Sequence, residues 1–224
     1  MKTLSSEQIQ QLFQFCEKHC VRYYDVQVEL VDHLASAIET EMSNNPNITF
    51  EDCLQKEYKS FGATGFAKYL NQQGSSIEKK LYRLKMRKLI SFLTIPKIIL
   101  TISILIIVLY LSLSIQNFQT SITTLYAVAI FFRIFMMIKL YFGKKEIRKP
   151  LSILNINSAT TSFSILIICN FFGQHLAFTY YFIPYKIFSA IITSYYIIET
   201  IALSLTWDQL KDFSKQAYPQ AFQK

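Results

Sequence analysis

The feature that most constrains this chain is a pair of long segments without charged residues. Ile98 to Phe132 and Leu151 to Tyr185 each run for 35 residues with no Asp, Glu, Lys or Arg. A helix of that length would reach ~52 Å at a rise of ~1.5 Å per residue, whereas the hydrocarbon core of a bilayer is ~30 Å thick. Each segment must therefore turn back on itself, and together they predict four membrane-spanning helices.

Polar runs, glycines and prolines set the borders of these spans. We predict spans at about residues 98–115, 122–141, 151–172 and 187–207, of which the fourth has the least defined start. We therefore expect an all-α protein. A small cytosolic helical domain (1–74) is followed by a basic juxtamembrane helix or linker (75–97), a four-helix transmembrane bundle (98–206) and a cytosolic tail (207–224).

The charge of the chain is distributed unevenly. The total is +8, but residues 1–74 hold 6 basic and 10 acidic side chains, whereas residues 75–97 hold 7 and 1. A nucleic-acid-binding module would carry its cations on the folded soluble domain, so we expect no nucleic-acid partner. Cations next to spans instead favour the bilayer and its anionic lipid headgroups as partners. The side chains expected to contact headgroups are Lys79, Lys80, Arg83, Arg87, Lys144, Lys145, Arg148 and Lys149.

Lys and Arg also predict the orientation. They occur before span one, between spans two and three, and after span four, whereas the connections 116–121 and 173–185 contain none. Because such cations are retained on the cytoplasmic side, both termini are expected in the cytoplasm. Glu7, Glu17 and Lys18 interrupt the first helical pattern, which argues against a cleaved signal peptide. Cytosolic thiols stay reduced, so we expect no disulfide.

Two charged residues lie inside apolar spans. Arg133 and Glu199 fall at matching depths above the inner ends of spans two and four, and a charge at such a depth needs a partner. We predict an ion pair between them. Two alternatives remain open. In the first, Arg133 extends past Lys139 to the inner headgroups while Glu199 bonds to Ser194 or Thr206. In the second, the acid belongs to a proton or ion relay.

The first 74 residues have helix signals of their own. Ser5 and Gln8 resemble a capping box at the start of a first helix, and a second helix is predicted at about 24–42. Thr49 begins a third helix, which ends at Gly62. A short fourth helix (64–71), a break at 72–76 and a basic helix from Ile77 toward Thr94 complete the prediction.

The polar side of the second helix is the expected interaction face, formed by Asp25, Glu29, Asp32 and His33. One candidate metal site on the second helix consists of Glu29, Asp32 and His33, but no second segment of the chain adds a ligand to it. A second candidate on the first helix consists of Cys16, His19 and Cys20, but both cysteines lie on the apolar stripe of that helix. We expect no metal and no cofactor. The sequence also lacks His-Glu-x-x-His, Gly-x-Ser-x-Gly and a pair of span-borne aspartates, so no catalysis is expected.

The soluble domain resembles HAAS, or permease-prefix, a small helical module that precedes membrane spans in bacterial proteins. The resemblance covers about residues 22–70. It is carried by Glu29-Leu30 with Asp32-His33-Leu34, then Thr49-Phe50-Glu51-Asp52, then Phe61-Gly62. Where the family usually has a turn glycine this chain has Asn44-Asn45-Pro46, and Cys53 replaces the usual alanine. The resemblance implies a cytosolic sensory or regulatory module, sometimes attached to an export permease and sometimes accompanied by a PadR-like repressor.

These observations predict a multi-pass protein of the bacterial inner membrane. Its cytosolic domain would regulate or bind a protein partner, with homo-oligomerisation as another possibility, and would have no turnover. The alternative is a membrane component of a small transporter or permease. Export permeases carry a large external domain between their first two spans, where this chain has about six residues, so that subtype is disfavoured. An enzymatic interpretation comes third and rests only on Glu29, Asp32 and His33.

Overall fold

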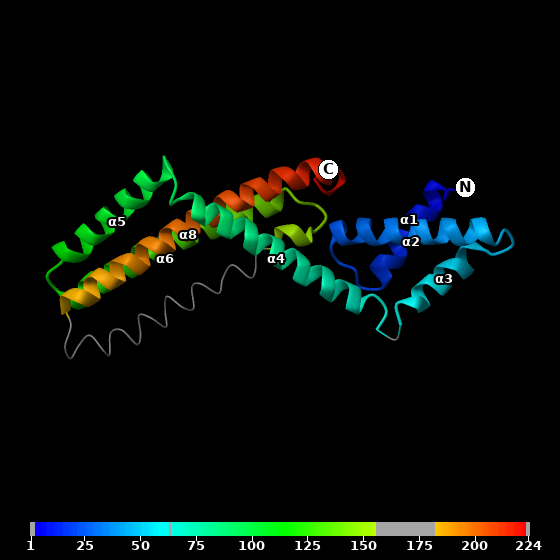
Figure 1. The fold of residues 1–224 in the computed structure, drawn as a ribbon, viewed down its shortest axis with the longest axis horizontal. Helices are drawn as coiled ribbons and strands as arrows, with labels where there is room; N and C mark the ends of the chain where they lie inside the picture. The colour runs from blue at the N-terminus through cyan, green and yellow to red at the C-terminus, as the bar shows by residue number, and fades with distance from the viewer. Residues whose placement is uncertain (1–2, 63, 156–181, 223–224) are drawn as a thin grey trace. The chain divides into compact units, whose positions relative to one another are not determined.

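The structure, a computed structural model, describes residues 3–62, 64–155 and 182–222, and every regular element in these ranges is helical (Figure 1). The chain divides into two compact units. Unit 1 comprises Met1–Lys80, Ile147–Asn155 and Ser214–Lys224, and unit 2 comprises Leu81–Glu146 and Ile156–Phe213. The N-terminal unit therefore includes two segments that the sequence assigned to a span and to the tail.

Three helices form the core of unit 1: α1 (Ser6–Lys18), α2 (Tyr24–Asn44) and α3 (Phe50–Ser60). Their apolar stripes meet in one cluster that includes Leu12, Leu30 and Leu34. The predicted capping box of Ser5 and Gln8 is confirmed, as is the Thr49 cap, whose hydroxyl accepts from the Asp52 N–H. Each cap satisfies an N–H that would otherwise lack a partner at the helix start.

Helix α4 (Ala67–Ser91) differs from the prediction because it continues through the expected break at 72–76. A glycine inside a helix costs only ~1 kcal/mol relative to alanine, and glutamine is a good helix former. No atom lies within 4 Å of the position that a Cβ on Gly74 would occupy. One helix therefore replaces the short helix, the break and the basic helix, and the two units divide within it after Lys80.

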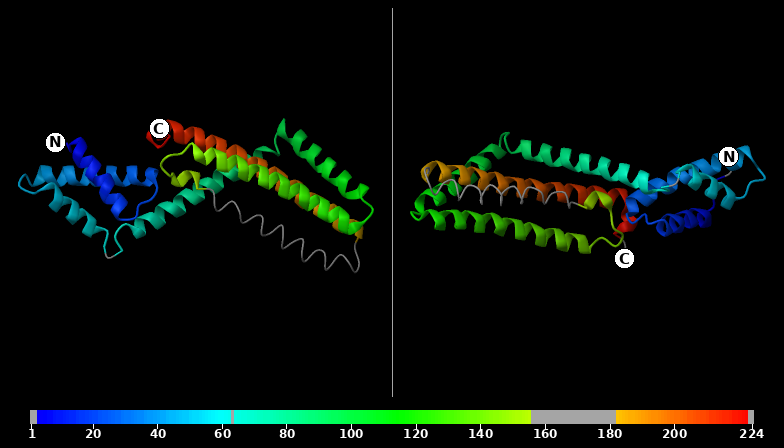
Figure 2. Two further views of the ribbon diagram at one scale, coloured as in Figure 1. Left: turned by 180° about the vertical axis from the view of Figure 1, so that it is seen from behind. Right: turned by 90° about the horizontal axis from the view of Figure 1, so that it is seen from below.

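Unit 2 contains the apolar helices α5 (Lys97–Ser114), α6 (Phe118–Lys145) and most of α8 (Phe182–Ala217). Each includes a stretch long and apolar enough to cross a membrane: Lys97–Ser114, Thr120–Lys145 and Lys186–Ala217. In the two views of Figure 2, α6 runs beside α8. Within the described residues, three helices long and apolar enough to cross a membrane are thus compatible with a membrane protein.

The ends of α6 and α8 differ from the predicted borders. Helix α6 begins at Phe118, four residues early, because the Asn117 side chain accepts from the Thr120 N–H. At the other end, α6 continues past the predicted border at residue 141, and Gly143 lies inside the helix. A Cβ on Gly143 would lie 3.0 Å from Nε1 of Trp207, so the glycine allows α6 to approach α8 closely. Trp207 is only 1% exposed, and α8 continues ten residues beyond it.

The predicted third span falls mostly outside the described residues. Its expected first residues, however, are part of unit 1: Ser152–Leu154 form the 3-10 helix η1, and Asn155 follows with non-helical backbone angles. A second 3-10 helix, η3 (Pro219–Ala221), lies near the C-terminus in the same unit.

Candidate functional site

A group of long-range hydrogen bonds in unit 1 surrounds the first turn of α2. We define the α2 junction as residues 23–25, residues 148–155, which come after α6, and residues 218–221, which come after α8. The first N–H of α2, from Tyr24, donates to the Pro150 carbonyl at 2.8 Å. A hydrogen bond from another part of the chain thus satisfies a helix-start N–H that no local cap serves.

Asp25 is the centre of the α2 junction. It is buried, and its carboxylate accepts hydrogen bonds from the N–H groups of Ser152 (2.9 Å), Ile153 (3.1 Å) and Val26 (3.1 Å) and from the Ser152 hydroxyl. A carboxylate in the first helical turn is also favoured by the helix dipole. The bonds from residues 127 and 128 positions away hold η1 against the start of α2.

The two tyrosines before Asp25 add further contacts. The Tyr23 hydroxyl accepts from Nδ2 of Asn155 at 2.9 Å, and the Tyr24 hydroxyl donates to Oε1 of Gln220 at 2.6 Å. Nζ of Lys149 lies 4.3 Å from the centroid of the Tyr24 ring, and burial raises the pKa of that tyrosine. The segments after α6 and α8 also bond to each other, since the N–H of Arg148 donates to the Ala221 carbonyl at 2.8 Å.

The predicted interaction face of α2 is therefore divided. Glu29, Asp32 and His33 are exposed, and Glu29 accepts a hydrogen bond from Nε2 of Gln73 at 2.9 Å. Asp25 is not part of an open face, because η1 covers it. The remaining exposed face is defined here as the α2 acidic face, formed by Glu29, Asp32 and His33.

The two metal hypotheses receive no structural support. In the part of the chain that the structure describes, no group of three His, Cys, Asp and Glu side chains is placed to hold a metal ion. Burial raises the pKa of Cys16 to about 12, with a smaller contribution from nearby Glu17, so its thiol stays protonated. His19 stacks against Phe15 instead, with ring centroids 4.2 Å apart.

In unit 2, Glu199 forms an ion pair that the sequence did not predict. Its Oε1 lies 2.9 Å from Nζ of Lys85; Glu199 is buried and Lys85 is partly buried. The second half of α4 makes this possible because Leu89, together with Phe92 just after the helix, packs with Ile198 and Ala202 of α8. The sequence predicted Arg133 as the partner of Glu199. The structure shows an ion pair of Glu199 with Lys85, because α4 lies beside α8.

Arg133, on α6, contacts α8 one helical turn before Glu199. Its guanidinium carbon is 5.8 Å from the ring centroid of Tyr196, which is within the range of a cation–π contact. Tyr196 is one helical turn before Glu199. The depth match inferred from the sequence did not indicate the Lys85–Glu199 pair, and the pair of Arg133 with Glu199 stays a prediction.

Polar contacts also lie at both ends of the apolar helices. Lys186 Nζ donates to the Ile115 carbonyl at 2.6 Å, where α5 has just ended. Toward the other end, Lys139 Nζ lies 2.6 Å from Oδ2 of Asp208, and Lys211 pairs with Glu146 at 2.9 Å. Lysine side chains at a helix C-terminus satisfy carbonyls that have no partner within the helix.

All eight cations that were predicted to contact headgroups are exposed: Lys79, Lys80, Arg83, Arg87, Lys144, Lys145, Arg148 and Lys149. Lys145 lies over the rings of Tyr141 and Phe142, at 5.3 and 5.6 Å from their centroids. Exposure next to apolar helices is what headgroup contact requires, and the contact itself stays a prediction.

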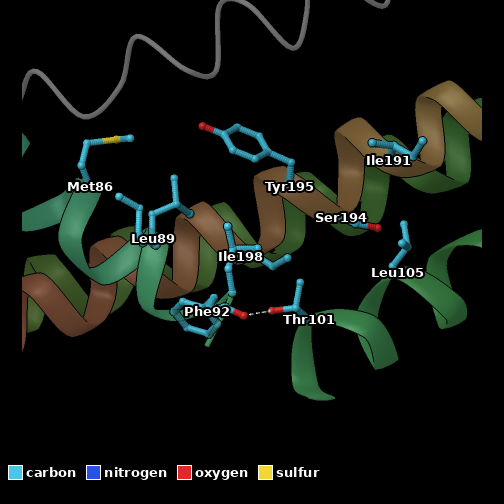
Figure 3. Close-up of a pocket in the computed structure, with 11 residues that line it drawn as sticks. Met86, Leu89, Phe92, Thr101, Leu105, Ile191, Ser194, Tyr195 and Ile198 are labelled. Atoms are coloured by element: carbon cyan, nitrogen blue, oxygen red, sulfur yellow. Dashed lines mark hydrogen bonds between the residues drawn. The ribbon is translucent and has the colours of Figure 1, made fainter. Parts of the chain in front are cut away.

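Unit 2 contains an apolar groove of ≈ 380 Å³ that the sequence did not indicate. Stripes from three helices line it: Met86, Leu89 and Ile90 from α4, Thr101 and Leu105 from α5, and Ile191, Tyr195 and Ile198 from α8 (Figure 3). The i, i+4 and i+7 spacing of the α8 residues could have signalled one wall. Phe92 and Leu93, in the connection between α4 and α5, also line the groove, and no helical periodicity indicates residues in such a connection.

Comparisons of the chain with models of protein families, with curated proteins and with solved structures give no match.

Proposed function

We propose that this protein is a membrane-embedded regulator whose cytosolic helical module binds a protein partner and has no turnover of its own. The observation that carries the proposal is the α2 junction. The start of α2 is bonded to the segments that follow two apolar helices, while the α2 acidic face further along the same helix stays exposed. The resemblance to the HAAS module points to the same role.

The α2 junction supports a regulatory role because few hydrogen bonds hold it, so it could open while the rest of unit 1 stays folded. The Asp25 carboxylate meets η1 through three hydrogen bonds, and these groups lie outside the main apolar cluster of α1, α2 and α3. Local openings of this kind occur without unfolding of a hydrophobic core. A change in the segments after α6 or α8 would therefore act first on the start of α2.

The negative net charge of residues 1–74 indicates the charge expected on the partner's surface. Residues 1–74 carry 6 basic and 10 acidic side chains, and the α2 acidic face adds two exposed carboxylates to one short stretch of helix. Complementary charge speeds association and suppresses wrong partners. We expect the partner to bring a basic surface to this face.

The proposed location is the bacterial inner membrane, with both termini in the cytoplasm. Three apolar helices and the absence of Lys and Arg from residues 116–121 support it. The exposed cations next to these helices would lie at anionic headgroups of the inner leaflet.

The test is retention of a partner by the full chain. Cells expressing the tagged chain are cross-linked before solubilisation in detergent, and the bound proteins are identified for wild type, Asp32→Arg and Glu17→Arg. Glu17→Arg is a matched control, because it makes the same charge reversal on the exposed surface of α1. The expected result is one protein that Asp32→Arg loses and Glu17→Arg keeps.

Two outcomes would contradict the proposal. One is an identical set of cross-linked proteins in all three samples. The other is solute flux in vesicles containing the purified chain, abolished by Glu199→Gln and unaffected by Asp32→Arg. That second pattern would favour the transporter alternative, in which function depends on polar residues of the membrane unit.

A further inference from the structure

The apolar groove of unit 2 has the size and lining expected of a site that binds a hydrocarbon chain. It is a cavity of ≈ 380 Å³ between the second half of α4, the start of α5 and α8, and it is partly open. This volume lies within the ~300–1,000 Å³ of typical ligand pockets. In Figure 3 the aliphatic side chains of Leu89, Leu105 and Ile198 border the space.

Two of the three polar side chains that line the groove have hydrogen-bond partners in the protein. The Thr101 hydroxyl donates to the Phe92 carbonyl at 2.8 Å, and the Ser194 hydroxyl donates to the Ala190 carbonyl at 2.8 Å. The Tyr195 hydroxyl points away from these groups, toward the side where Met86 lies (Figure 3). A polar solute needs convergent donors and acceptors, which this groove does not present. An apolar chain needs none.

Lys97, the first residue of α5, is a cation next to the groove. Nζ of Lys97 is 5.5 Å from the ring centroid of Phe92, which lines the groove, and 3.2 Å from the Ser91 hydroxyl oxygen. Lys85, Lys139 and Lys211 each pair with a carboxylate, whereas in the described ranges no carboxylate lies within ion-pair distance of Lys97. This ammonium group is held by a neutral hydroxyl and an aromatic face.

We propose that the groove binds one acyl chain of an anionic phospholipid whose phosphate is held by the Lys97 ammonium group. The apolar walls favour a hydrocarbon chain. The ammonium group favours phosphatidylglycerol, which is anionic, over phosphatidylcholine, whose choline cation neutralises the phosphate. An unpaired cation at the membrane surface attracts anionic lipids. The inference does not depend on the proposed regulatory function, since it uses unit 2 alone.

The test measures lipids retained by the full chain. The purified protein is reconstituted in vesicles of equal phosphatidylglycerol and phosphatidylcholine, re-solubilised in detergent, and its bound lipids are counted by mass spectrometry. Leu105→Trp places a bulky ring in the groove. Ile106→Trp is the matched control on the next residue of the same helix, where the side chain is 60% exposed. Lys97→Gln removes the cation.

Wild type and Ile106→Trp are expected to retain a stoichiometric amount of phosphatidylglycerol, and Leu105→Trp to lose it. Lys97→Gln is expected to keep bound lipid while its preference for phosphatidylglycerol falls about fivefold, the effect of one near-surface cation. Equal retention by Leu105→Trp and wild type, or equal loss in the two tryptophan variants, would overturn the groove as the site. An unchanged preference in Lys97→Gln would overturn the headgroup assignment.

A second measurement covers the case in which Leu105→Trp does not fold. Wild-type protein is irradiated with phosphatidylglycerol that carries a diazirine near the end of one acyl chain. Adducts are expected on Met86, Leu105 or Tyr195. Adducts on the outward face of α5, at Ile106, without any on the groove would refute the proposal. A partner lost in Asp32→Arg with lipid retention intact separates this test from that of the regulatory function.

Discussion

Removing the Asp25 carboxylate tests the α2 junction directly. In Asp25→Ala, the N–H groups of Ser152 and Ile153 and the Ser152 hydroxyl lose their acceptor, and Ser152 and Ile153 are both buried. A hydrogen bond to a charged group contributes about 1.5–3 kcal/mol, and an unsatisfied buried donor costs about 1–3 kcal/mol. Water entering the opened junction will satisfy part of this, so we expect about 3–4 kcal/mol less stability for the docking of η1.

Hydrogen–deuterium exchange of the full chain in detergent measures that loss. A change of about 3–4 kcal/mol corresponds to exchange faster by about two to three orders of magnitude, at about 1.4 kcal/mol per factor of ten. The faster exchange is expected in peptides containing residues 151–155. Peptides of α1 and α3 should keep their protection, since Asp25 lies outside the main apolar cluster.

Asp32→Ala is the matched control, because it truncates an exposed aspartate on the same helix. It should leave residues 151–155 protected. Equal protection of these residues in wild type and Asp25→Ala, with the module folded, would refute the assignment of Asp25 as the group that holds η1. Loss of protection throughout unit 1 would refute the claim that the junction opens locally.

Three further predictions concern single side chains. Gly143→Ala should lower thermal stability by about 1–3 kcal/mol through overpacking and shift the emission of Trp207, the chain's single tryptophan, whereas Gly74→Ala, in open space, should not. Glu199→Gln leaves the partly buried Lys85 ammonium without its carboxylate partner and should cost about 3 kcal/mol, the low end for a buried ion pair. Most of this loss should be recovered when Lys85→Met is added, and thermal unfolding as late as in wild type would contradict the prediction. Burial raises the pKa of the Cys16 thiol to about 12, so maleimide should label it slowly, at a rate that rises as pH increases. Because the unfolded thiol ionises near pH 9, folded unit 1 should lose stability above about pH 9. In single-cysteine variants the exposed Cys20 should react with maleimide before Cys16.

Local signals of unit 1 could be predicted from the sequence because their partners are three residues apart. The Ser5–Gln8 box and the Thr49 cap each depend on one turn of helix. The first span, predicted at 98–115, agrees with α5 within one residue at each end because hydropathy and the flanking polar residues define it. The break expected at 72–76 shows the limit: local propensity is a weak preference, and neighbouring helix formers overrode one glycine.

The α2 junction could not be predicted because nothing local separates Asp25 from Asp32. Seven residues are almost two full helical turns, so the two aspartates lie on one side of α2 and belong to the same polar pattern. What distinguishes them is η1, whose residues are 127 positions further along the chain. The same holds for Lys85 and Glu199, which are separated by 114 positions. Their pairing requires α4 to lie beside α8, a contact that periodicity does not define.

The size of the Asp25 contribution also bears on how a partner could act on the module. If η1 is held by about 3–4 kcal/mol, the open junction is populated at about one part in 10² to 10³. A partner that binds the α2 acidic face equally well in both states would leave this population unchanged. To open the junction, it must interact with groups that η1 covers, such as the Asp25 carboxylate, and a basic side chain meets that requirement. The open state would then present a continuous acidic row from Asp25 to Asp32, so the exposed face and the junction would act as one surface.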